Sequence, residues 1–340
     1  MRGLSASLGA DVLARDHFMV KGGEQVLLTA DTSSDLAAAE AILSVCRALG
    51  ADPVLTVIPQ LPFQGKLADP YISDVVSRAA LESDVWFDMT FPYMAGSDMH
   101  DAVMKQGKCR YMLLGDVDAT GLDNLLGRTD LDAVFALQQA FDQLITSREG
   151  ADCRVTNPAG TDVTFTLGKT VTKKSRRTSA PGAYTPLGSG IFYPVPETVK
   201  GKIVLDGVFH EFYTLLDTPM TLIVDGKIQQ IADGGGQTMA MDRALRRAGG
   251  GEYGQVIHFT YGFHPTARFS GTSFIEDIRS CGSNAIGLGK PWWEPGGGEN
   301  HPDAVVTNQS LWIDGEMIVG DGRIVGPQDV LVAADALGCG

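Results

Sequence analysis

The chain has 340 residues, which is long for one ordinary domain and comfortable for two. Its 41 acidic and 27 basic residues give a net charge of −14, so a nucleic acid would meet repulsion over most of the surface. The sequence contains no run of about 18 apolar residues, the length that a transmembrane helix requires. We therefore predict a protein that binds neither nucleic acid nor membranes.

The amino terminus and the cysteines favour a cytoplasmic protein. Residues 1–10 contain one positive charge and no apolar segment typical of a secretory signal. The five cysteines are scattered and include no CxxC pair, so neither a disulfide framework nor a thiolate zinc site is indicated. We expect reduced, mostly buried thiols and a chain that assembles into a homo-oligomer.

The first third of the chain alternates between strand-like and helix-like patterns. Apolar runs predict strands at residues 25–30, 53–58, 85–89 and 110–114. Between and after them, the patterns predict helices at residues 36–49, 69–80, 98–106 and 130–149. Pro70 stands in the first turn of the second helix, which we expect to bury Ile72, Val75, Val76, Ala79 and Ala80. Strands that alternate with helices of this length indicate a mainly parallel sheet.

Residues 1–150 are thus predicted to form an α/β domain. Neither a GxGxxG motif after the first strand nor a GxxxxGK[ST] motif occurs, so a nucleotide site is not indicated. We expect this domain to serve as a scaffold or as one wall of a pocket.

Residues 151–340 are predicted to form an α+β metal-binding domain. Apolar patterns predict strands at residues 163–167, 201–207, 221–224, 227–231 and 255–261, and a helix at 237–248. The Asp225-Gly226 pair between two of these strands predicts an antiparallel hairpin. This half also contains four of the six histidines: His210, His258, His264 and His301.

The sharpest local pattern for chemistry is the H-x-D pair of His301 and Asp303, preceded by a glycine-rich loop at residues 295–299. In extended backbone, residues two apart point to the same face, so both side chains can reach one ion. The glycines would let the backbone approach that ion closely. A surface turn is the alternative interpretation of this short motif.

A third ligand must come from elsewhere in the chain. His258 lies in the middle of a predicted strand, where an unpaired polar side chain is costly to bury. A structural histidine with a hydrogen bond is the alternative. Two histidines and one carboxylate form the set expected for an open-sided Fe(II) site, and zinc accepts the same ligands together with a water.

Several segments resemble known metalloenzymes. They read EYGQVIHFTYGFHPTAR at residues 252–268, NHPD at 300–303 and LWIDGEMI at 311–318, with GIFYPVPE at 190–197 and GKIVLD at 201–206. The chain resembles the 2,5-dihydroxypyridine 5,6-dioxygenases of aerobic nicotinate degradation and, beyond them, the aminopeptidase T-type metallopeptidases. The first resemblance implies an iron ion held by His258, His301 and Asp303.

The chain departs from both families. The peptidases use a two-metal site with extra glutamates, where this sequence has Gly190-Ile191 and Gln255. A dinuclear site is therefore disfavoured. The dioxygenases carry a pocket histidine where this sequence reads Ala183-Tyr184-Thr185, so Tyr184 is a candidate replacement.

The preferred interpretation is a non-haem Fe(II) extradiol-type dioxygenase that acts on a hydroxylated pyridine or related aromatic compound and on dioxygen. His264 is a candidate acid or base, because an unperturbed histidine titrates near pH ~6.5. Arg268 and Arg177 are candidates to hold an anionic group of the substrate. The alternatives are a zinc or manganese hydrolase that uses the same three ligands on a peptide or cyclic amide, and a non-catalytic binding protein.

Overall fold

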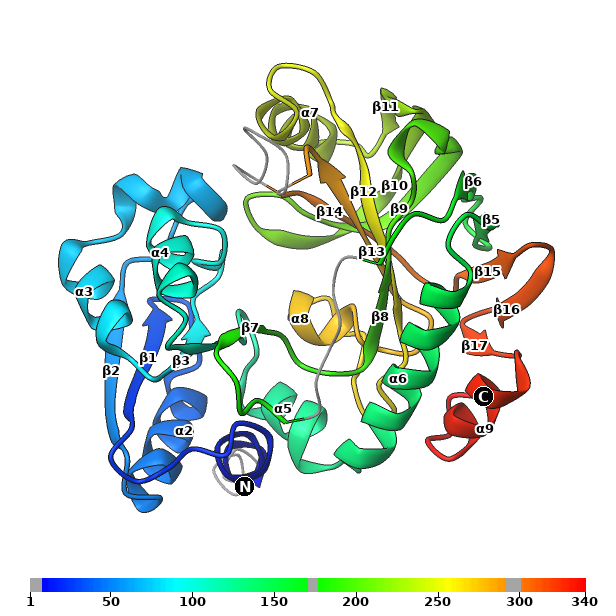
Figure 1. The fold of residues 1–340 in the computed structure, drawn as a ribbon. Helices are drawn as coiled ribbons and strands as arrows, with labels where there is room; N and C mark the ends of the chain where they lie inside the picture. Colours follow the sequence, from blue (N-terminus) through cyan, green and yellow to red (C-terminus); the bar gives the residue numbers. More distant parts are fainter. Residues whose placement is uncertain (1–7, 171–176, 292–300) are drawn as a thin grey trace. The chain divides into compact units, whose positions relative to one another are not determined.

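The computed structural model describes residues 8–170, 177–291 and 301–340 (Figure 1). Contacts within the chain divide it into two compact units. The first comprises residues 1–131, 175–187 and 273–276, and the second comprises residues 132–174, 188–272 and 277–340. The predicted glycine-rich loop at 295–299 lies outside the described residues, as do residues 173–176 of the basic segment KKSRR at 173–177.

The first unit contains a five-stranded parallel sheet in the order β2-β1-β3-β4-β7. Its strands are β1 (Gln25–Asp31), β2 (Asp52–Ile58), β3 (Val85–Met89), β4 (Arg110–Leu113) and β7 (Gly182–Tyr184). Its helices are η1 (Val12–His17), α2 (Leu36–Ala48), η2 (Gly65–Tyr71), α3 (Asp74–Glu82), α4 (Asp98–Gln106), α5 (Ala119–Leu122) and η3 (Asp123–Gly127). The predicted parallel sheet is confirmed, and the wholly buried β3 is typical of a parallel strand covered on both faces.

The second predicted helix begins later than expected. Helix α3 starts at Asp74, because the side chain of Ser73 accepts a hydrogen bond from the Val76 amide and fixes the first turn. Pro70 belongs instead to the short 3-10 helix η2. The start at Asp74 sets which residues face inward, so Val76 is buried while Val75, which we expected to be buried, is 76% exposed.

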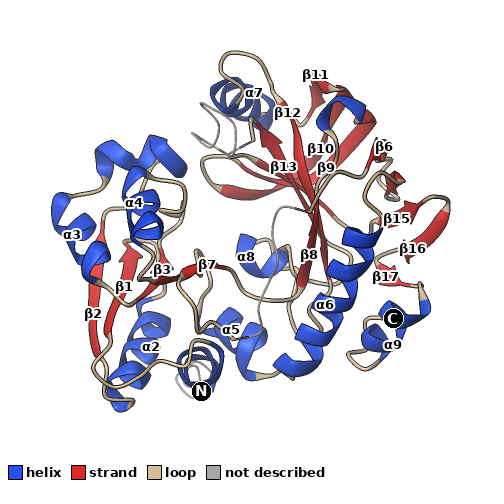
Figure 2. Cartoon of the chain, in the orientation of Figure 1, coloured by secondary structure: helices blue, strands red, loops and turns tan. Residues whose placement is uncertain are grey.

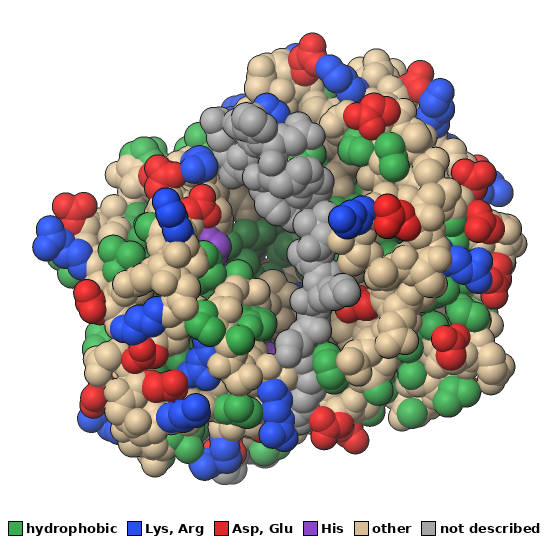
Figure 3. All heavy atoms as spheres, viewed as in Figure 1, with side chains coloured by type: hydrophobic (Ala, Val, Ile, Leu, Met, Phe, Trp, Pro, Cys, Tyr) green, Lys and Arg blue, Asp and Glu red, His purple; other side chains and the backbone are tan. Residues whose placement is uncertain are grey.

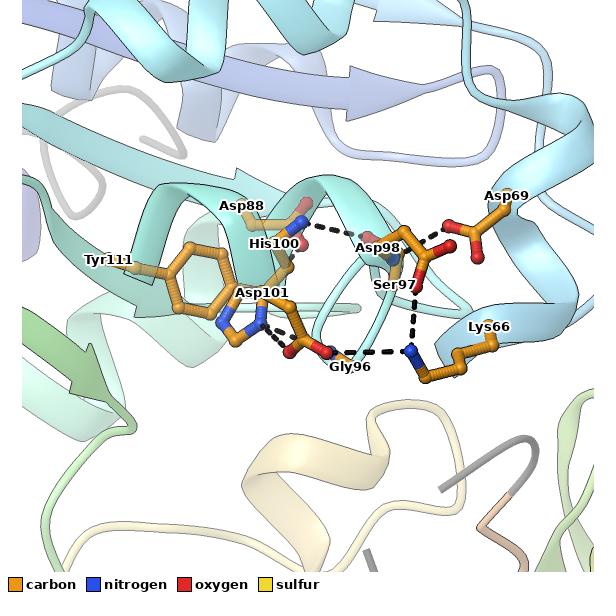
Figure 4. Close-up of polar contacts among 9 residues, drawn as sticks. All are labelled: Lys66, Asp69, Asp88, Gly96, Ser97, Asp98, His100, Asp101 and Tyr111. Carbon is orange, nitrogen blue, oxygen red and sulfur yellow. Dashed lines mark hydrogen bonds and ion pairs between the residues drawn. The ribbon is translucent and has the colours of Figure 1, made fainter. Parts of the chain in front are cut away.

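A buried carboxylate organises the end of β3 (Figure 4). Asp88 is fully buried and accepts hydrogen bonds from the Tyr111 hydroxyl at 2.7 Å, from the Thr90 hydroxyl at 2.6 Å and from the Thr29 hydroxyl at 2.9 Å. Burial raises the pKa of Asp88, and these donors oppose that shift. The carboxylate therefore fixes three strands and the following loop at one point.

The beginning of α4 carries a network of paired charges (Figure 4). Ser97 caps the helix by accepting a hydrogen bond from the His100 amide. Lys66 contacts Asp98 at 2.6 Å, and the Asp98 amide donates to Asp69. These charges satisfy one another and join η2 to α4.

The second unit contains a twelve-stranded sheet whose main path runs β17-β16-β15-β5-β6-β9-β14-β13-β12-β8 (Figure 2). Strand β10 also pairs with β9, and β11 pairs with β10. The first six strands are β5 (Asp152–Thr156), β6 (Asp162–Thr166), β8 (Ser189–Phe192), β9 (Lys200–Phe209), β10 (Tyr213–Asp225) and β11 (Lys227–Asp233). The other six are β12 (Gln255–Gly262), β13 (Asn284–Gly289), β14 (Asp303–Val306), β15 (Ser310–Ile313), β16 (Glu316–Gly320) and β17 (Arg323–Ile324). The helices are α6 (Leu131–Ser147), η4 (Pro196–Thr198), α7 (Gln237–Ala248), α8 (Phe274–Asp277) and α9 (Gln328–Asp335), and α8 crosses the division between the units.

The predicted α+β character of this half is confirmed. The β10–β11 hairpin turns at Gly226, whose φ of +69° suits a glycine, and pairs Asp225 with Lys227. Aromatic rings fill the core: Phe259 stacks on Phe165 with ring centres 4.6 Å apart and on Phe192 at 5.6 Å. This packing anchors one face of β12.

The surface in Figure 3 shows acidic and basic side chains interspersed over the described residues of the face in view. None of the helices within the described ranges combines the length and apolarity that a membrane crossing requires.

Candidate metal centre

Three neighbouring strands bring two of the predicted ligands, His258 and Asp303, into one row, and His301 lies just before the third strand. His258 of β12 lies opposite Gly287 of β13, and Gly287 lies opposite Asp303 of β14. Directly opposed residues of antiparallel strands point to the same face. His258 and Asp303 therefore share one face of the sheet, and the residue between them has no side chain.

A β-bulge sets the direction of His258. The pairing of β12 with β13 shifts between Val256 and His258, so one extra residue, Ile257, is inserted in β12. Val256 belongs to the apolar core together with Phe259. In a regular strand without the bulge, His258 would share the face of Val256, because residues two apart point to the same side. The bulge thus directs His258 away from the core and toward Asp303.

The ligand atoms of the three side chains lie within 4.8 Å of one another. Nε2 of His258 is 3.0 Å from Nε2 of His301, and each nitrogen is 3.7 Å from Oδ1 of Asp303. With bonds of about 2.1 Å, two ligands at right angles on one ion are about 3 Å apart. The three atoms are therefore spaced as donors to a single ion.

The electrostatics of the site also fit a cation. Burial raises the pKa of Asp303 to about 8 and lowers that of His301 to about 4. The pKa of His258 is lowered well below its usual range by burial and by the neighbouring His301, while a hydrogen bond with the backbone of Ala285 partly opposes that shift. A divalent cation would stabilise the carboxylate and bind neutral imidazoles, so the donors present match its needs.

Gly287 provides the space in which the imidazoles meet. A Cβ atom on this residue would lie 2.6 Å from Nε2 of His301 and would overlap the ring of His258. Any other residue at this position would displace both rings. Gly287 was not among the predicted site residues, although a glycine inside a strand often marks a close approach of this kind.

Other groups surround the three candidate ligands. The ring of Tyr193, also missed from the sequence, meets that of His258 edge to face at 6.3 Å. His210 is fully buried after β9, where its Nε2 lies 3.4 Å from Gln237. Among the described histidines, cysteines and acidic residues, His258, His301 and Asp303 form the one group of three that could hold an ion.

The position that would carry a glutamate in a two-metal peptidase is blocked. Gly190 is buried in β8, and a Cβ atom there would collide with the ring of Phe141. Gln255 begins β12 with an amide in place of a carboxylate. Both observations agree with a single-metal interpretation.

The remaining predicted residues lie in different settings. His264 is 1% exposed and its Nδ1 lies 3.3 Å from the Thr266 hydroxyl, while Arg268 is exposed. Both belong to the second unit. Arg177 and Tyr184 belong to the first unit, where Arg177 pairs with Asp16 and Tyr184 donates a hydrogen bond to the carbonyl of residue 180. Their roles in binding or catalysis stay predictions.

The sequence of residues 14–326 matches the NicX family, described as 2,5-dihydroxypyridine 5,6-dioxygenase. The chain belongs to this family. The resemblance inferred from the H-x-D pair and the His258 strand is therefore confirmed, and the chain is a dioxygenase-family protein.

Two solved structures resemble this NicX-family chain. The structure of 2,5-dihydroxypyridine dioxygenase from Pseudomonas putida KT2440 is 18% identical, with a TM-score of 0.72 over 97% of this chain and 99% of that one. Wild-type AmpT from Thermus thermophilus is 14% identical, with a TM-score of 0.65 over 95% of this chain and 99% of that one. At these identities the likeness establishes a shared fold. No protein with a curated description matches the chain significantly in sequence.

Proposed function

We propose that this NicX-family chain is a mononuclear non-haem Fe(II) dioxygenase that cleaves the ring of a hydroxylated pyridine or a related aromatic compound. The observation that carries the proposal is the convergence of two imidazole nitrogens and one carboxylate oxygen, with no second carboxylate among the described residues of the group, in a dioxygenase-family protein. This donor set leaves several positions of an ion open, as oxygen-activating iron sites require.

His258, His301 and Asp303 would hold the iron. Bound there, Fe(II) would supply open coordination positions for a substrate hydroxyl and dioxygen, and the charge that favours loss of the hydroxyl proton. The buried site keeps both imidazoles neutral, so their nitrogens are available as ligands without first losing a proton. Gly287 keeps the space beside them clear.

Other residues are assigned roles as part of this proposal. His264 and Tyr184 are the proposed groups for moving a proton to or from the substrate. Arg268 and Arg177 are the proposed partners of an anionic substituent, because a guanidinium matches a carboxylate in charge and geometry. The first compound to test is 2,5-dihydroxypyridine, because it is the substrate named for the family.

The test is a measurement of oxygen uptake. Protein purified without oxygen is loaded with Fe(II), mixed with 2,5-dihydroxypyridine and followed in parallel by an oxygen electrode and by loss of ring absorbance. We expect one dioxygen consumed per ring cleaved, and no reaction after oxidation to Fe(III). The His301→Ala variant serves as the control for free iron in solution.

The same assay under nitrogen separates oxygenation from hydrolysis. Ring loss at an equal rate without oxygen would disprove the dioxygenase proposal and favour a hydrolase. Release of a free amino acid from a leucyl amide under nitrogen would identify a peptidase that uses the same site with zinc or manganese.

A further inference from the structure

Two cysteines that are far apart in sequence meet in the second unit. Sγ of Cys281 lies 3.1 Å from Sγ of Cys339, 58 residues later. This separation is about 1 Å longer than a disulfide bond, so a small rotation of either side chain brings the sulfurs to bonding distance. The scattered spacing of the cysteines gave no sign of the pair.

The two thiols differ in accessibility. Cys281 is exposed, whereas Cys339 is 2% exposed and its Sγ lies 3.2 Å from the carbonyl oxygen of Phe263. The backbone of Cys339 is held by hydrogen bonds with Ala334 and Ile324. The Cys281 thiol can therefore react with a reagent from solution, whereas the Cys339 thiol is buried beside it.

The charges around the pair also distinguish the thiols. A hydrogen bond from Cys339 lowers the pKa of Cys281, burial opposes this, and the positive charge of Arg323 adds to the lowering. Arg323 is held nearby, since its Nη1 donates to the Gly340 carbonyl at 3.1 Å. The hydrogen bond and burial raise the pKa of Cys339. Cys281 is thus suited to attack a disulfide from solution, and Cys339 is suited to attack the mixed disulfide that results.

The other three cysteines lack these features. All are buried, and burial raises the pKa of Cys46 and Cys153 to about 12 and that of Cys109 to about 11. A buried thiol with a raised pKa is a poor nucleophile near neutral pH. These residues serve as internal controls.

We propose that Cys281 and Cys339 form a reversible disulfide by exchange with a small-molecule disulfide. The Cys281 thiolate attacks the small disulfide, which forms a mixed disulfide and releases one small thiolate. The Cys339 sulfur then attacks the Cys281 sulfur, releases the second small thiol and gives up its proton. Two protein thiols are oxidised and one small disulfide is reduced to two thiols, so atoms and electrons balance.

The bond would tie the end of the chain to the loop that precedes β13. In the last part of the chain, the Cys339 carbonyl accepts a hydrogen bond from the Ile324 amide of β17, and Val330 and Ala334 of α9 belong to the apolar core. Closing a loop of 58 residues removes conformational freedom from the unfolded chain and so stabilises the fold. The bond is expected to reduce opening of the carboxyl-terminal segment.

The experiment uses the full-length protein with its metal content left as purified, treated with oxidised glutathione. We expect the wild type to lose two of its five thiols and to yield a peptide pair linked through Cys281 and Cys339 in mass spectrometry. Dithiothreitol should restore all thiols. Oxidised protein should unfold at a higher temperature than reduced protein and resist carboxyl-terminal proteolysis.

Single substitutions separate the role of Cys281, which attacks first, from that of Cys339, which closes the protein disulfide. Cys339→Ser should accumulate one glutathionyl group on Cys281, whereas Cys281→Ser should keep all four remaining thiols. Cys153→Ser, the matched control, should still form the bond. Wild-type protein that keeps five thiols, or that forms links only between chains, would overturn the proposal. Equal thiol loss in Cys281→Ser would overturn the assignment of Cys281 as the attacking residue.

Discussion

Nε2 of His258 lies 3.7 Å from Oδ1 of Asp303, although a whole strand separates the two residues in the sheet. Neighbouring strands lie about 4.8 Å apart, so residues two strands away normally have their backbones about 10 Å apart. The two side chains converge because the strand between them presents Gly287 at that row. A glycine in one strand thus determines a contact between two others.

Gly287→Ala should therefore disrupt the site while the sheet survives. The added Cβ atom would lie 2.6 Å from Nε2 of His301, so both imidazoles must move. We expect metal affinity to fall at least about tenfold, as when groups that orient ligands are removed. Metal titration of the stripped protein, with circular dichroism to check the fold, measures this directly.

Gly236→Ala is the matched control for that substitution. Gly236 precedes α7 with φ of −66°, and an added Cβ atom would meet nothing within 4 Å. This variant should bind metal as the wild type does. If both glycine variants retained full metal affinity, Gly287 would not be needed to position the imidazoles.

The ligand set is tested by metal content. His301→Ala should lower metal affinity by more than about 100-fold, because it removes one of three donors rather than an orienting group. His264→Ala should retain the metal, since His264 is buried beside Thr266 and is not part of the group of three. Elemental analysis of both variants after dialysis measures how much metal each one retains. Metal loss in His264→Ala together with retention in His301→Ala would reverse the assignment.

The sequence predicts elements best where local chemistry defines their ends. Helix α4 at Asp98–Gln106 and helix α7 at Gln237–Ala248 have the predicted bounds, and each is followed by a glycine. The start of α3 was wrong because proline at 70 and serine at 73 are both acceptable near a helix start. Only the hydrogen bond from Val76 to Ser73 distinguishes them.

The candidate site was predictable only in part for a physical reason. His301 and Asp303 are two residues apart in the chain, at the start of β14, so their closeness follows from the local sequence. His258 joins them through pairing between strands and through the bulge at Ile257, and neither is encoded in any short segment. Resemblance to a family identified His258, while Gly287 and Tyr193 required the folded chain.

Adding a carboxylate should not convert the site into a two-metal centre. A glutamate at Gly190 would collide with Phe141, which is fully buried. We expect Gly190→Glu to lower the free energy of unfolding by on the order of 3 kcal/mol, through overpacking and a buried charge. Urea unfolding and elemental analysis should show a less stable protein that still binds one ion. Two ions per chain at unchanged stability would contradict the steric argument.

Asp116 should make stability depend on pH. Its carboxylate accepts hydrogen bonds from the Ser273 hydroxyl and from the amides of Phe274 and Ile275, all in the first unit. Burial nevertheless raises its pKa from 3.8 to about 6, and these donors oppose the shift. The folded protein therefore keeps a proton on Asp116 at pH values where the unfolded chain has lost it.

The direction of this pH dependence is set by whether the folded or the unfolded protein binds more protons. Below pH 3.8 the group is neutral in both states, and between that pH and about 6 the folded state alone holds the proton. The free energy of unfolding contributed by Asp116 is thus present at low pH and is lost as pH rises through about 6. Its slope is at most about 1.4 kcal/mol per pH unit.

Asp116→Asn should remove this contribution, because an amide does not titrate. Urea unfolding midpoints measured from pH 4 to pH 7 give the difference in stability between wild type and variant at each pH. Contributions from other buried acids such as Asp88 are the same in both proteins and cancel in this difference. The variant should gain stability relative to the wild type as pH rises, with no further change above pH 7. Asp162→Asn is the control, since a hydrogen bond from Arg154 lowers the pKa of Asp162 below 3.8. Its titration is centred below the measured range, so its difference from the wild type should stay nearly constant from pH 5 to pH 7. A difference between wild type and Asp116→Asn that stays constant across this range would show that Asp116 titrates alike in the folded and unfolded chain.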